Sequence, residues 1–268
     1  FNYKPNTKKF KSEDPSFSKK LVIHLMCLIP ILLGFIIPIL FIIGNVVYEF
    51  DRIDFEKVLD LTSNTFIVSL IASSIIIFIA VYFQFLKRII KNKILTVFNE
   101  AISLTYALPG AVIGLSLIIM FTSFPLKLEF LIGSFIVLIY AYVIRYMAVG
   151  ISPLKSSFEK HPSSYDDTAV NLGMGPLKLF KSIHLPINKS AIAIAFLITF
   201  VDIIKELPIT LILRPFNFDT LAVQTYEYAI EEMIPKSSIY SLTIVMMGII
   251  LLIFLKKIVN KEIDVSRD

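Results

Sequence analysis

Residues 166–186 read DDTAVNLGMGPLKLFKSIHLP and form a polar stretch between two long apolar runs. Gly173 suits the left-handed turn that ends many helices, and Pro176 suits the first turn of a following helix. We therefore expect this stretch to fold as two short helices at an angle, outside the membrane.

The first of these helices has an expected start and an expected contact face. Ser163 is a favourable cap residue, and Asp166 and Asp167 then fall in the first turn, where the helix dipole favours acidic side chains. Ala169 and Gly173 are four residues apart, so they share a helix face with almost no side-chain bulk. Such a face would let the surface of another protein come close.

The rest of the chain is rich in apolar residues that gather in long runs. Of the 268 residues, 56% are hydrophobic, and the mean hydropathy is +0.78. A membrane span needs roughly 20 apolar residues. The sequence therefore predicts an all-α, polytopic membrane protein with six transmembrane helices. The six runs are 21–43, 65–86, 101–121, 128–149, 190–213 and 239–255.

Lysine and arginine residues are concentrated in alternate loops between these runs. They are frequent before the first run, between the second and third, between the fourth and fifth, and after the sixth. Because positively charged loops tend to stay in the cytoplasm, we expect both termini and the 166–186 loop on the cytoplasmic side. This pattern explains the net charge of +5 by membrane orientation, without a nucleic-acid partner.

These assignments divide the chain into three parts. We expect a cytoplasmic linker or tail at 1–20, a six-helix transmembrane permease domain at 21–258 and a cytoplasmic tail at 259–268. The transmembrane domain would carry a cytoplasmic coupling loop at 152–189 and an outer loop at 214–236.

The order acidic-x-Ala-x3-Gly-x9-Ile-x-Leu-Pro within residues 167–186 resembles, at full spacing, the EAA loop of type I ABC importer permeases. Asp167 stands where that family usually has glutamate, and Thr168 stands where it usually has alanine. The resemblance implies the permease fold of that family and a loop that docks in a groove of a separate ATPase subunit. The residues that it assigns to this coupling are Asp167, Ala169, Gly173, Ile183, Leu185 and Pro186.

Other stretches resemble the ferric iron branch of these permeases. They are KELPITLILRPFNFDTLA at 205–222 followed by YEYA at 226–229, YALPG at 106–110 and GFIIP at 34–38. The resemblance implies a permease subunit that passes ferric iron across the inner membrane by alternating access. Branches for thiamine, polyamines and oxyanions share much of this frame, so these solutes are alternatives.

The resemblance also implies partners. A dimer of ABC ATPase subunits would use ATP and Mg, a periplasmic binding protein would deliver the solute, and a second permease half would complete the path through the lipid bilayer. Because the chain begins with Phe1 and a polar stretch, we expect it to be the C-terminal half of a fused permease; a homodimer or a paralogous subunit is the alternative. We expect a transport subunit of the bacterial cytoplasmic membrane, without enzyme activity or a cofactor of its own.

Charged residues inside a span are costly, roughly 2.5–3.5 kcal/mol near the helix centre, and three lie in the fifth run. Asp202 and Glu206 are four residues apart and would share one face, with Lys205 beside them. Prolines interrupt both the third and the fifth runs, as is common where helices line a path. An ion pair between Lys205 and either acid that only holds the bundle together is the structural alternative. The candidate translocation path consists of Pro109, Gly110, Asp202, Lys205, Glu206 and Pro208.

The outer loop mixes acidic and aromatic residues, and its apolar spacing predicts a short amphipathic helix at about 220–232. Tyrosines at a membrane edge usually act as anchors, so we do not assign them as iron ligands. On the cytoplasmic side, Arg145 is expected to extend from the fourth run to the interface. The resemblance implies that the outer loop contacts the binding protein through Arg214, Asp219, Tyr226, Glu227 and Glu231.

The sequence lacks the Gly-x4-Gly-Lys-Ser/Thr loop that binds nucleotide phosphates, so we do not expect ATP hydrolysis by this chain. Its three histidines are scattered, and no Cys/His cluster has metal-ligand spacing, so no metal site is expected. The rival interpretation is a secondary transporter driven by an ion gradient, with residues 202–206 as the ion-coupling site. Such a transporter would have no use for the loop at 166–186.

Overall fold

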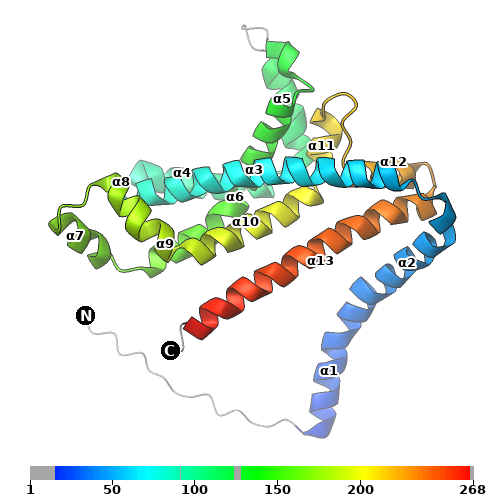
Figure 1. Ribbon diagram of the computed structural model, residues 1–268, viewed down its shortest axis with the longest axis horizontal. Helices are drawn as coiled ribbons and strands as arrows, with labels where there is room; N and C mark the ends of the chain where they lie inside the picture. Colours follow the sequence, from blue (N-terminus) through cyan, green and yellow to red (C-terminus); the bar gives the residue numbers. More distant parts are fainter. Residues whose placement is uncertain (1–15, 91, 124–127, 266–268) are drawn as a thin grey trace.

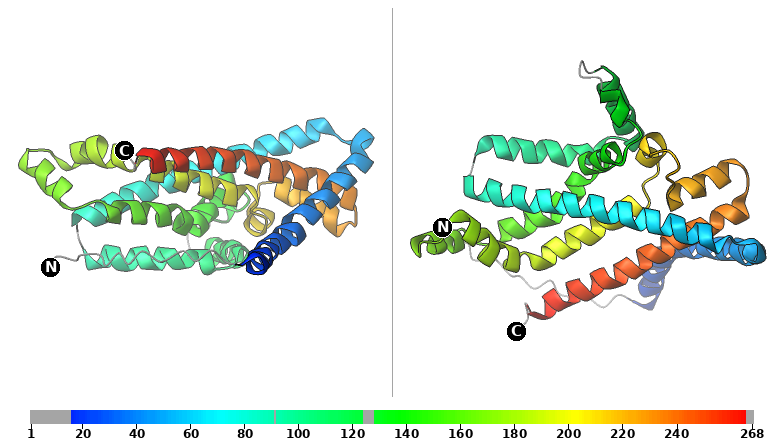
Figure 2. Two further views of the ribbon diagram at one scale, coloured as in Figure 1. Left: turned by 90° about the horizontal axis from the view of Figure 1, so that it is seen from below. Right: turned by 45° about the horizontal axis from the view of Figure 1, so that its top comes forward.

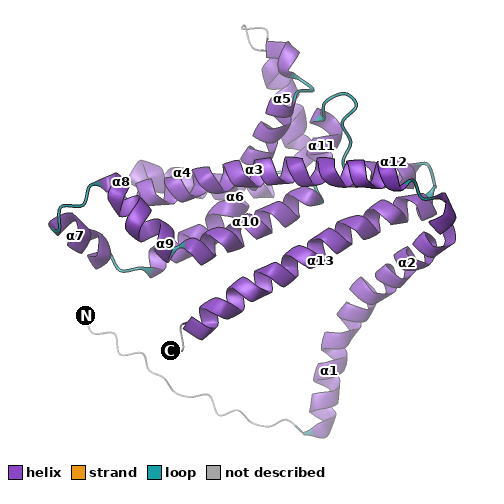
Figure 3. Cartoon of the chain, viewed as in Figure 1, coloured by secondary structure: helices purple, strands orange, loops and turns teal. Residues whose placement is uncertain are grey.

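The computed structural model describes residues 16–90, 92–123 and 128–265. Every regular element in these ranges is helical, so the predicted all-α class is confirmed for the described part of the chain (Figure 1 and Figure 3). Short π or 3₁₀ segments join several helices. The α-helices are α1 (Phe17–Ile31), α2 (Ile37–Glu49), α3 (Phe55–Ile90), α4 (Lys93–Leu104), α5 (Gly110–Ser123), α6 (Phe135–Lys160), α7 (Ser164–Asn171), α8 (Pro176–Leu179), α9 (Leu185–Ile187), α10 (Lys189–Ile204), α11 (Pro208–Leu213), α12 (Leu221–Ile230) and α13 (Ile234–Val265).

Within the described residues, four helices are long and apolar enough to cross a membrane, and two bent helix pairs raise the number to six if each pair is one span. The two bent pairs are Lys93–Ala107 with Gly110–Ser123 and Pro176–Ile187 with Lys189–Ile204. The number six matches the number of predicted runs, but the second pair begins before the predicted fifth run and includes part of the 166–186 loop, so only its second arm, α10, lies in that run. The four continuous spans are Phe17–Arg52, Phe55–Ile90, Phe135–Lys160 and Ile234–Val259. Three of the long helices start away from the predicted edges. α3 begins at Phe55 rather than near 65, α6 begins at Phe135 rather than near 128, and α13 begins at Ile234 rather than near 239.

The long helices α3, α6 and α10 pack together at the centre, and α13 packs on α10 and α2. Four alanines in this core, Ala72, Ala80, Ala141 and Ala195, are completely buried. Lipid tails are as apolar as leucine, so helix association in a membrane depends on close packing, which small residues allow. The bundle is therefore held together by backbones that approach one another closely.

The closest of these approaches is between α3 and the backbone of α6 at Gly150. A Cβ atom there would lie 2.8 Å from Ile76 Cγ2 and 3.2 Å from Ile77 Cδ1, both on α3. We predict that Gly150→Ala lowers the free energy of unfolding by about 1–3 kcal/mol, because the two helices must separate slightly. Thermal unfolding in detergent measures this. Gly248→Ala is the matched control, since no atom lies within 4 Å of its Cβ position; equal losses in both variants would contradict the packing argument.

In the described part of the chain, only the second half of the first span contacts the bundle. It is longer than the predicted 21–43, because helix continues from Phe17 to Arg52 through a π segment, and none of its most apolar window is buried. α2 packs on α13, whereas α1 extends away from the other helices (Figure 1 and Figure 2). Its apolar surface is thus left for lipid or for another subunit.

The third predicted run, 101–121, is not a single helix. The helical arm that ends at Ala107 and the arm that begins at Gly110 are bent by 110°. Leu108 between them is extended, with φ −73° and ψ 133°, the conformation that a following proline favours. The expected break at Pro109 is confirmed, and α5 consequently points out of the bundle (Figure 1).

The fifth predicted run, 190–213, is interrupted as well. α10 ends at Ile204, and α11 starts at Pro208, which suits a first helical position because it lacks an N–H group. Glu206 lies in the break between the two helices. The prediction that Asp202 and Glu206 share one helix face is therefore wrong.

The ends of the helices gather at two ends of the molecule. α7, α8 and α9, the junction of α3 with α4, and the described end of α13 lie toward one end (Figure 1). The turn between α2 and α3 lies near α12 at the other end (Figure 1). Two of the loops that the charge pattern assigns to the cytoplasm, together with the described end of α13, thus share one end of the fold, whereas α1 starts away from that end (Figure 1).

Candidate functional site

The polar loop folds as two helical pieces joined by Gly173, as predicted. Gly173 has φ +77°, and the amide of Met174 donates to the carbonyl of Ala169 at 3.0 Å, which is a left-handed helix ending of the expected kind. The second piece is longer than a single turn, because α8 continues through a π segment into α9, from Pro176 to Ile187. The loop projects at one end of the bundle (Figure 1).

The start of α7 differs from the prediction. Ser163 precedes the helix, but its side chain accepts no capping hydrogen bond. The carboxylate of Asp166 is held instead by Arg88, at 2.6 Å from Nε, and by His184, at 2.8 Å from Nε2. Burial lowers the pKa of His184, and the nearby Asp166 carboxylate opposes this effect. Neutral His184 can donate its Nε2–H to Asp166.

The small-residue face divides between the inside and the outside of the protein. Ala169 is only 2% exposed and packs among Phe85, Phe158 and Leu179. Gly173 is exposed, and no atom lies within 4 Å of its Cβ position. The expectation that both residues form one open contact face is therefore wrong: Ala169 anchors α7 to the bundle, and of these two residues only Gly173 leaves its backbone accessible.

The loop also exposes apolar side chains that sequence reasoning did not single out. Leu172 is 74% exposed, Leu177 is 66% exposed, and Val170 is also exposed. Asp167 lies beside Val170 at a small surface pocket. Aliphatic side chains next to an accessible carboxylate, on helices that extend beyond the bundle, are typical of a protein-binding surface. These three apolar residues lie in an otherwise polar stretch, and that pattern could have indicated a binding surface from the sequence.

The last three predicted coupling residues lie at the root of the loop. Ile183 packs with the small cluster around Ala169, and Leu185 packs against the main core of the bundle. Pro186 is exposed. Ile183 and Leu185 thus turn their side chains toward the chain's own core and fix the loop on it.

The two broken helices meet deep in the bundle. A Cβ atom on Gly110 would lie 2.9 Å from Glu206 Oε1 and 3.3 Å from Pro208 Cβ, so any other residue there would force the Glu206 carboxylate to move. Glu206 is 5% exposed. Its carboxylate accepts hydrogen bonds from the Ile209 amide at 3.0 Å and from the Tyr146 hydroxyl. These residues form a packed joint between the α4–α5 and α10–α11 breaks.

Arg145 balances the charge of this joint. Its Nε lies 3.4 Å from Glu206 Oε2, and its guanidinium also donates to the Leu108 carbonyl, which the helix break has freed. The guanidinium lies over the rings of Tyr106 and Tyr146, a favourable arrangement for a cation. The expectation that Arg145 reaches the membrane interface is therefore wrong.

A depression of about 460 Å³ lies beside the joint, where α4, α6 and α10 approach one another. Of the six predicted path residues, Asp202 lines it, and Lys205 pairs with Asp202 at 2.8 Å. The Lys205 side chain is 61% exposed. The other four, Pro109, Gly110, Glu206 and Pro208, belong to the break regions. The polar groups of the depression come from Ser103, Tyr106, Ser152 and Asp202.

The outer loop contains the predicted short helix, observed as α12. Thr220 caps it by accepting the Val223 amide. Arg214 forms ion pairs with Asp219 and, at 2.8 Å, with Glu227, so three of the five predicted contact residues bind one another. The remaining two, Tyr226 and Glu231, are exposed.

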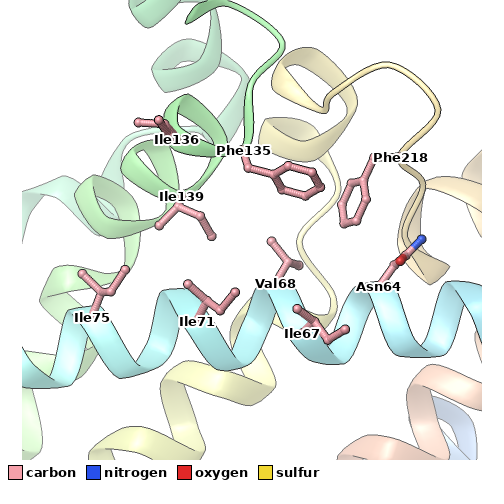
Figure 4. Close-up of a pocket in the computed structure, with 9 residues that line it drawn as sticks. All are labelled: Asn64, Ile67, Val68, Ile71, Ile75, Phe135, Ile136, Ile139 and Phe218. Atoms are coloured by element: carbon pink, nitrogen blue, oxygen red, sulfur yellow. The ribbon is translucent and has the colours of Figure 1, made fainter.

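An apolar pocket beside α3 has almost no polar groups that could bind a charged solute. It has a volume of about 570 Å³ and lies between α3 and the start of α6 (Figure 4). Asn64 is its one polar lining residue, and the others are apolar (Figure 4). Among the described residues, no group of three or more His, Cys, Asp or Glu side chains could hold a metal ion.

No protein-family model matches the chain. It is 27% identical over 205 residues to a Fe(3+)-transport system permease protein, FbpB 2, of Haemophilus influenzae, a match that covers 76% of this chain and 40% of that protein. It is 32% identical over 83 residues to the maltose/maltodextrin transport system permease protein MalG of Escherichia coli strain K12, covering 31% of this chain and 28% of that protein.

The corresponding maltose/maltodextrin permease of Photorhabdus laumondii is 31% identical over 83 residues, covering 31% of this chain and 28% of the relative. The chain therefore spans less than half the length of these curated relatives in each match. All three relatives are permease proteins, and the described helices include several that can cross a membrane. The chain is a multi-pass protein of the cytoplasmic membrane.

Proposed function

Because the chain is homologous to the permease subunits of ABC importers, we propose that it forms one half of the membrane path of an ATP-driven importer for ferric iron. The observation that carries this proposal is the loop from Ser164 to Ile187, which extends beyond the bundle as two helical pieces and exposes apolar side chains. A loop of this kind has a use where a separate motor subunit docks on the permease.

The charge pattern supports a cytoplasmic location for this end. The loop between α3 and α4, the loop at 161–188 and the end of α13 carry the excess of lysine and arginine. We therefore propose that two ATPase subunits dock here and bind the ATP and Mg. ATP binding would draw together the loops of the two permease halves, and hydrolysis would release them.

We place the other partners of the transporter on surfaces that this chain leaves exposed. The unburied apolar surface of the first span suits lipid and the second permease half. We propose that a periplasmic binding protein docks at the opposite end, on Tyr226 and Glu231 and the Arg214 ion pairs. Breaking those ion pairs would free Asp219 and Glu227 for the binding protein.

The iron assignment rests on the Haemophilus relative and on the depression beside the joint. Ferric iron prefers hard oxygen ligands, and the polar groups of the depression are the hydroxyls of Ser103, Tyr106 and Ser152 with the carboxylate of Asp202. These oxygens could coordinate iron weakly as it passes, without forming a tight binding site. An oxyanion would need hydrogen-bond donors or cations in place of the Asp202 carboxylate.

We predict that the Asp202→Asn variant of the complete importer loses iron uptake by about 10- to 150-fold, because a lost charged partner weakens binding by about 1.5–3 kcal/mol. Uptake of radioactive Fe³⁺ into proteoliposomes, with the binding protein outside and ATP supplied to the motor, measures this. Asp60→Asn is the matched control, since Asp60 is exposed on α3.

Three results would change the assignment. Uptake that needs no ATP but follows an ion gradient would favour a secondary transporter. ATP-driven uptake of another solute, without uptake of iron, would support the importer assignment and contradict iron as the solute. Equal uptake by the Asp202→Asn variant and the wild type would show that the depression does not line the translocation path.

A further inference from the structure

Arg88 lies near the end of α3 and makes an unusually complete set of contacts with the loop. Its Nε donates to Asp166 Oδ2 at 2.6 Å. Its two terminal nitrogens donate to three backbone carbonyls, those of Phe158, His161 and Pro162. A guanidinium offers five N–H donors in a fixed plane, and most of them are used here to join α3 to the segment that connects α6 with α7.

The other carboxylate oxygen of Asp166 extends this network. It accepts from His184 Nε2 at 2.8 Å, and the His184 ring stacks on Phe158 with a centroid distance of 5.5 Å and an angle of 10°. The side chains of Arg88 and Asp166 are only 13% and 14% exposed. Charged hydrogen bonds shielded from water in this way are stronger and more rigid than surface pairs.

α3 carries this connection across the whole molecule. Near its other end, Thr65 Oγ1 accepts the Leu221 amide at 2.9 Å, and Asn64 donates to the Asp219 carbonyl at 3.2 Å. Thr65 and Arg88 are thus about 35 Å apart along one continuous helix, at 1.5 Å per residue. A displacement of the loop can reach α12 through α3 without passing through a flexible segment.

We propose that Arg88 is the positioning residue that transmits movement of the loop 164–187 to α3, through Asp166. This inference rests on the proposed function, in which a motor subunit moves the loop. Ala169 packing against Phe85 also holds α7 on α3. Such an apolar contact is not directional and lets the two surfaces slide, whereas the hydrogen bonds of the planar Arg88 guanidinium fix the orientation of α7 relative to α3.

The test uses the complete importer with its ATPase in proteoliposomes and compares solute imported per ATP hydrolysed. We expect Arg88→Gln and Asp166→Asn each to lower this ratio by about tenfold, as for a lost charged hydrogen bond, while ATP hydrolysis continues. Lys87→Gln is the matched control: Lys87 is the neighbouring residue on α3, and its partner at 3.5 Å, Glu159, has a side chain that is 59% exposed. Its ratio should stay at the wild-type value.

The double variant Arg88→Gln/Asp166→Asn distinguishes transmission from general damage. If the residues act through each other, it should be no worse than the poorer single variant. An unchanged ratio in Asp166→Asn, or additive losses in the double variant, would overturn the inference. Asp166→Asn keeps the size of the side chain, so it carries the test if Arg88→Gln does not accumulate. A wild-type complex without ATP-driven uptake would instead remove the proposed function itself.

Discussion

Replacing Arg145 with leucine is expected to destabilise the protein by about 3–5 kcal/mol, because the buried carboxylate of Glu206 is then left without a compensating charge. The change also removes the donor to the Leu108 carbonyl and the contact with the Tyr106 and Tyr146 rings. Unfolding in detergent, followed by circular dichroism, measures the loss. Because the joint connects two broken spans, the variant should also accumulate poorly in the membrane.

The double variant Arg145→Leu/Glu206→Gln is the control for this result. Glutamine removes the unpaired charge, and its carbonyl oxygen can still accept the Ile209 amide, while its NH2 group can donate to the Tyr146 hydroxyl oxygen. We expect it to recover most of the stability lost in Arg145→Leu. A double variant as unstable as the single one would show that the guanidinium acts through packing and not through its charge.

Gly173→Asp is expected to reduce solute uptake by about 10- to 100-fold, with insertion into the membrane preserved. No atom of the chain lies within 4 Å of the Gly173 Cβ position, so a side chain there meets nothing in this protein. An overfilled contact with a docked partner costs about 1–3 kcal/mol, which corresponds to the expected loss. Uptake per inserted molecule, determined by transport assay and immunoblot, measures it.

Gly133→Asp separates docking from backbone strain. Gly133 has the same φ of +77° and open space at its Cβ position, but it lies in the turn before α6, away from the loop. A side chain costs roughly 1–2 kcal/mol in this conformation at either site. We expect Gly133→Asp to lose similar stability and to retain uptake. Loss of uptake in both variants would mean that strain, and not a partner, explains the effect.

Much of the fold could be predicted because membrane spans follow from local composition. The apolar runs located the four continuous spans and overlap both bent pairs, and Pro109 and Pro208 marked the α4–α5 and α10–α11 breaks. The 110° bend at the first break could not be predicted. A proline removes a hydrogen bond locally, but the new helix direction depends on what it packs against, and here Gly110 packs against Glu206 and Pro208.

The site was harder to predict, because a sequence pattern does not say which face of a helix is covered. Ala169 and Gly173 have the right spacing for a shared face, yet the bundle covers Ala169 and leaves Gly173 open. Arg145 resembles a residue that reaches the interface, since its partner Glu206 lies on a distant segment. Arg88 was indistinguishable from the other basic residues that orient the loop between α3 and α4.

Site-specific photocrosslinking from Leu177 tests most directly whether this loop receives a motor subunit. A benzoyl-phenylalanine placed there, in the exposed second helix of the loop, should crosslink to the ATPase subunit co-expressed with the importer. The same probe at Phe216, which is 93% exposed in the loop between α11 and α12, should not. Crosslinking to the ATPase from Leu177 alone is the expected result; none from Leu177, or equal yields from both positions, would contradict the account.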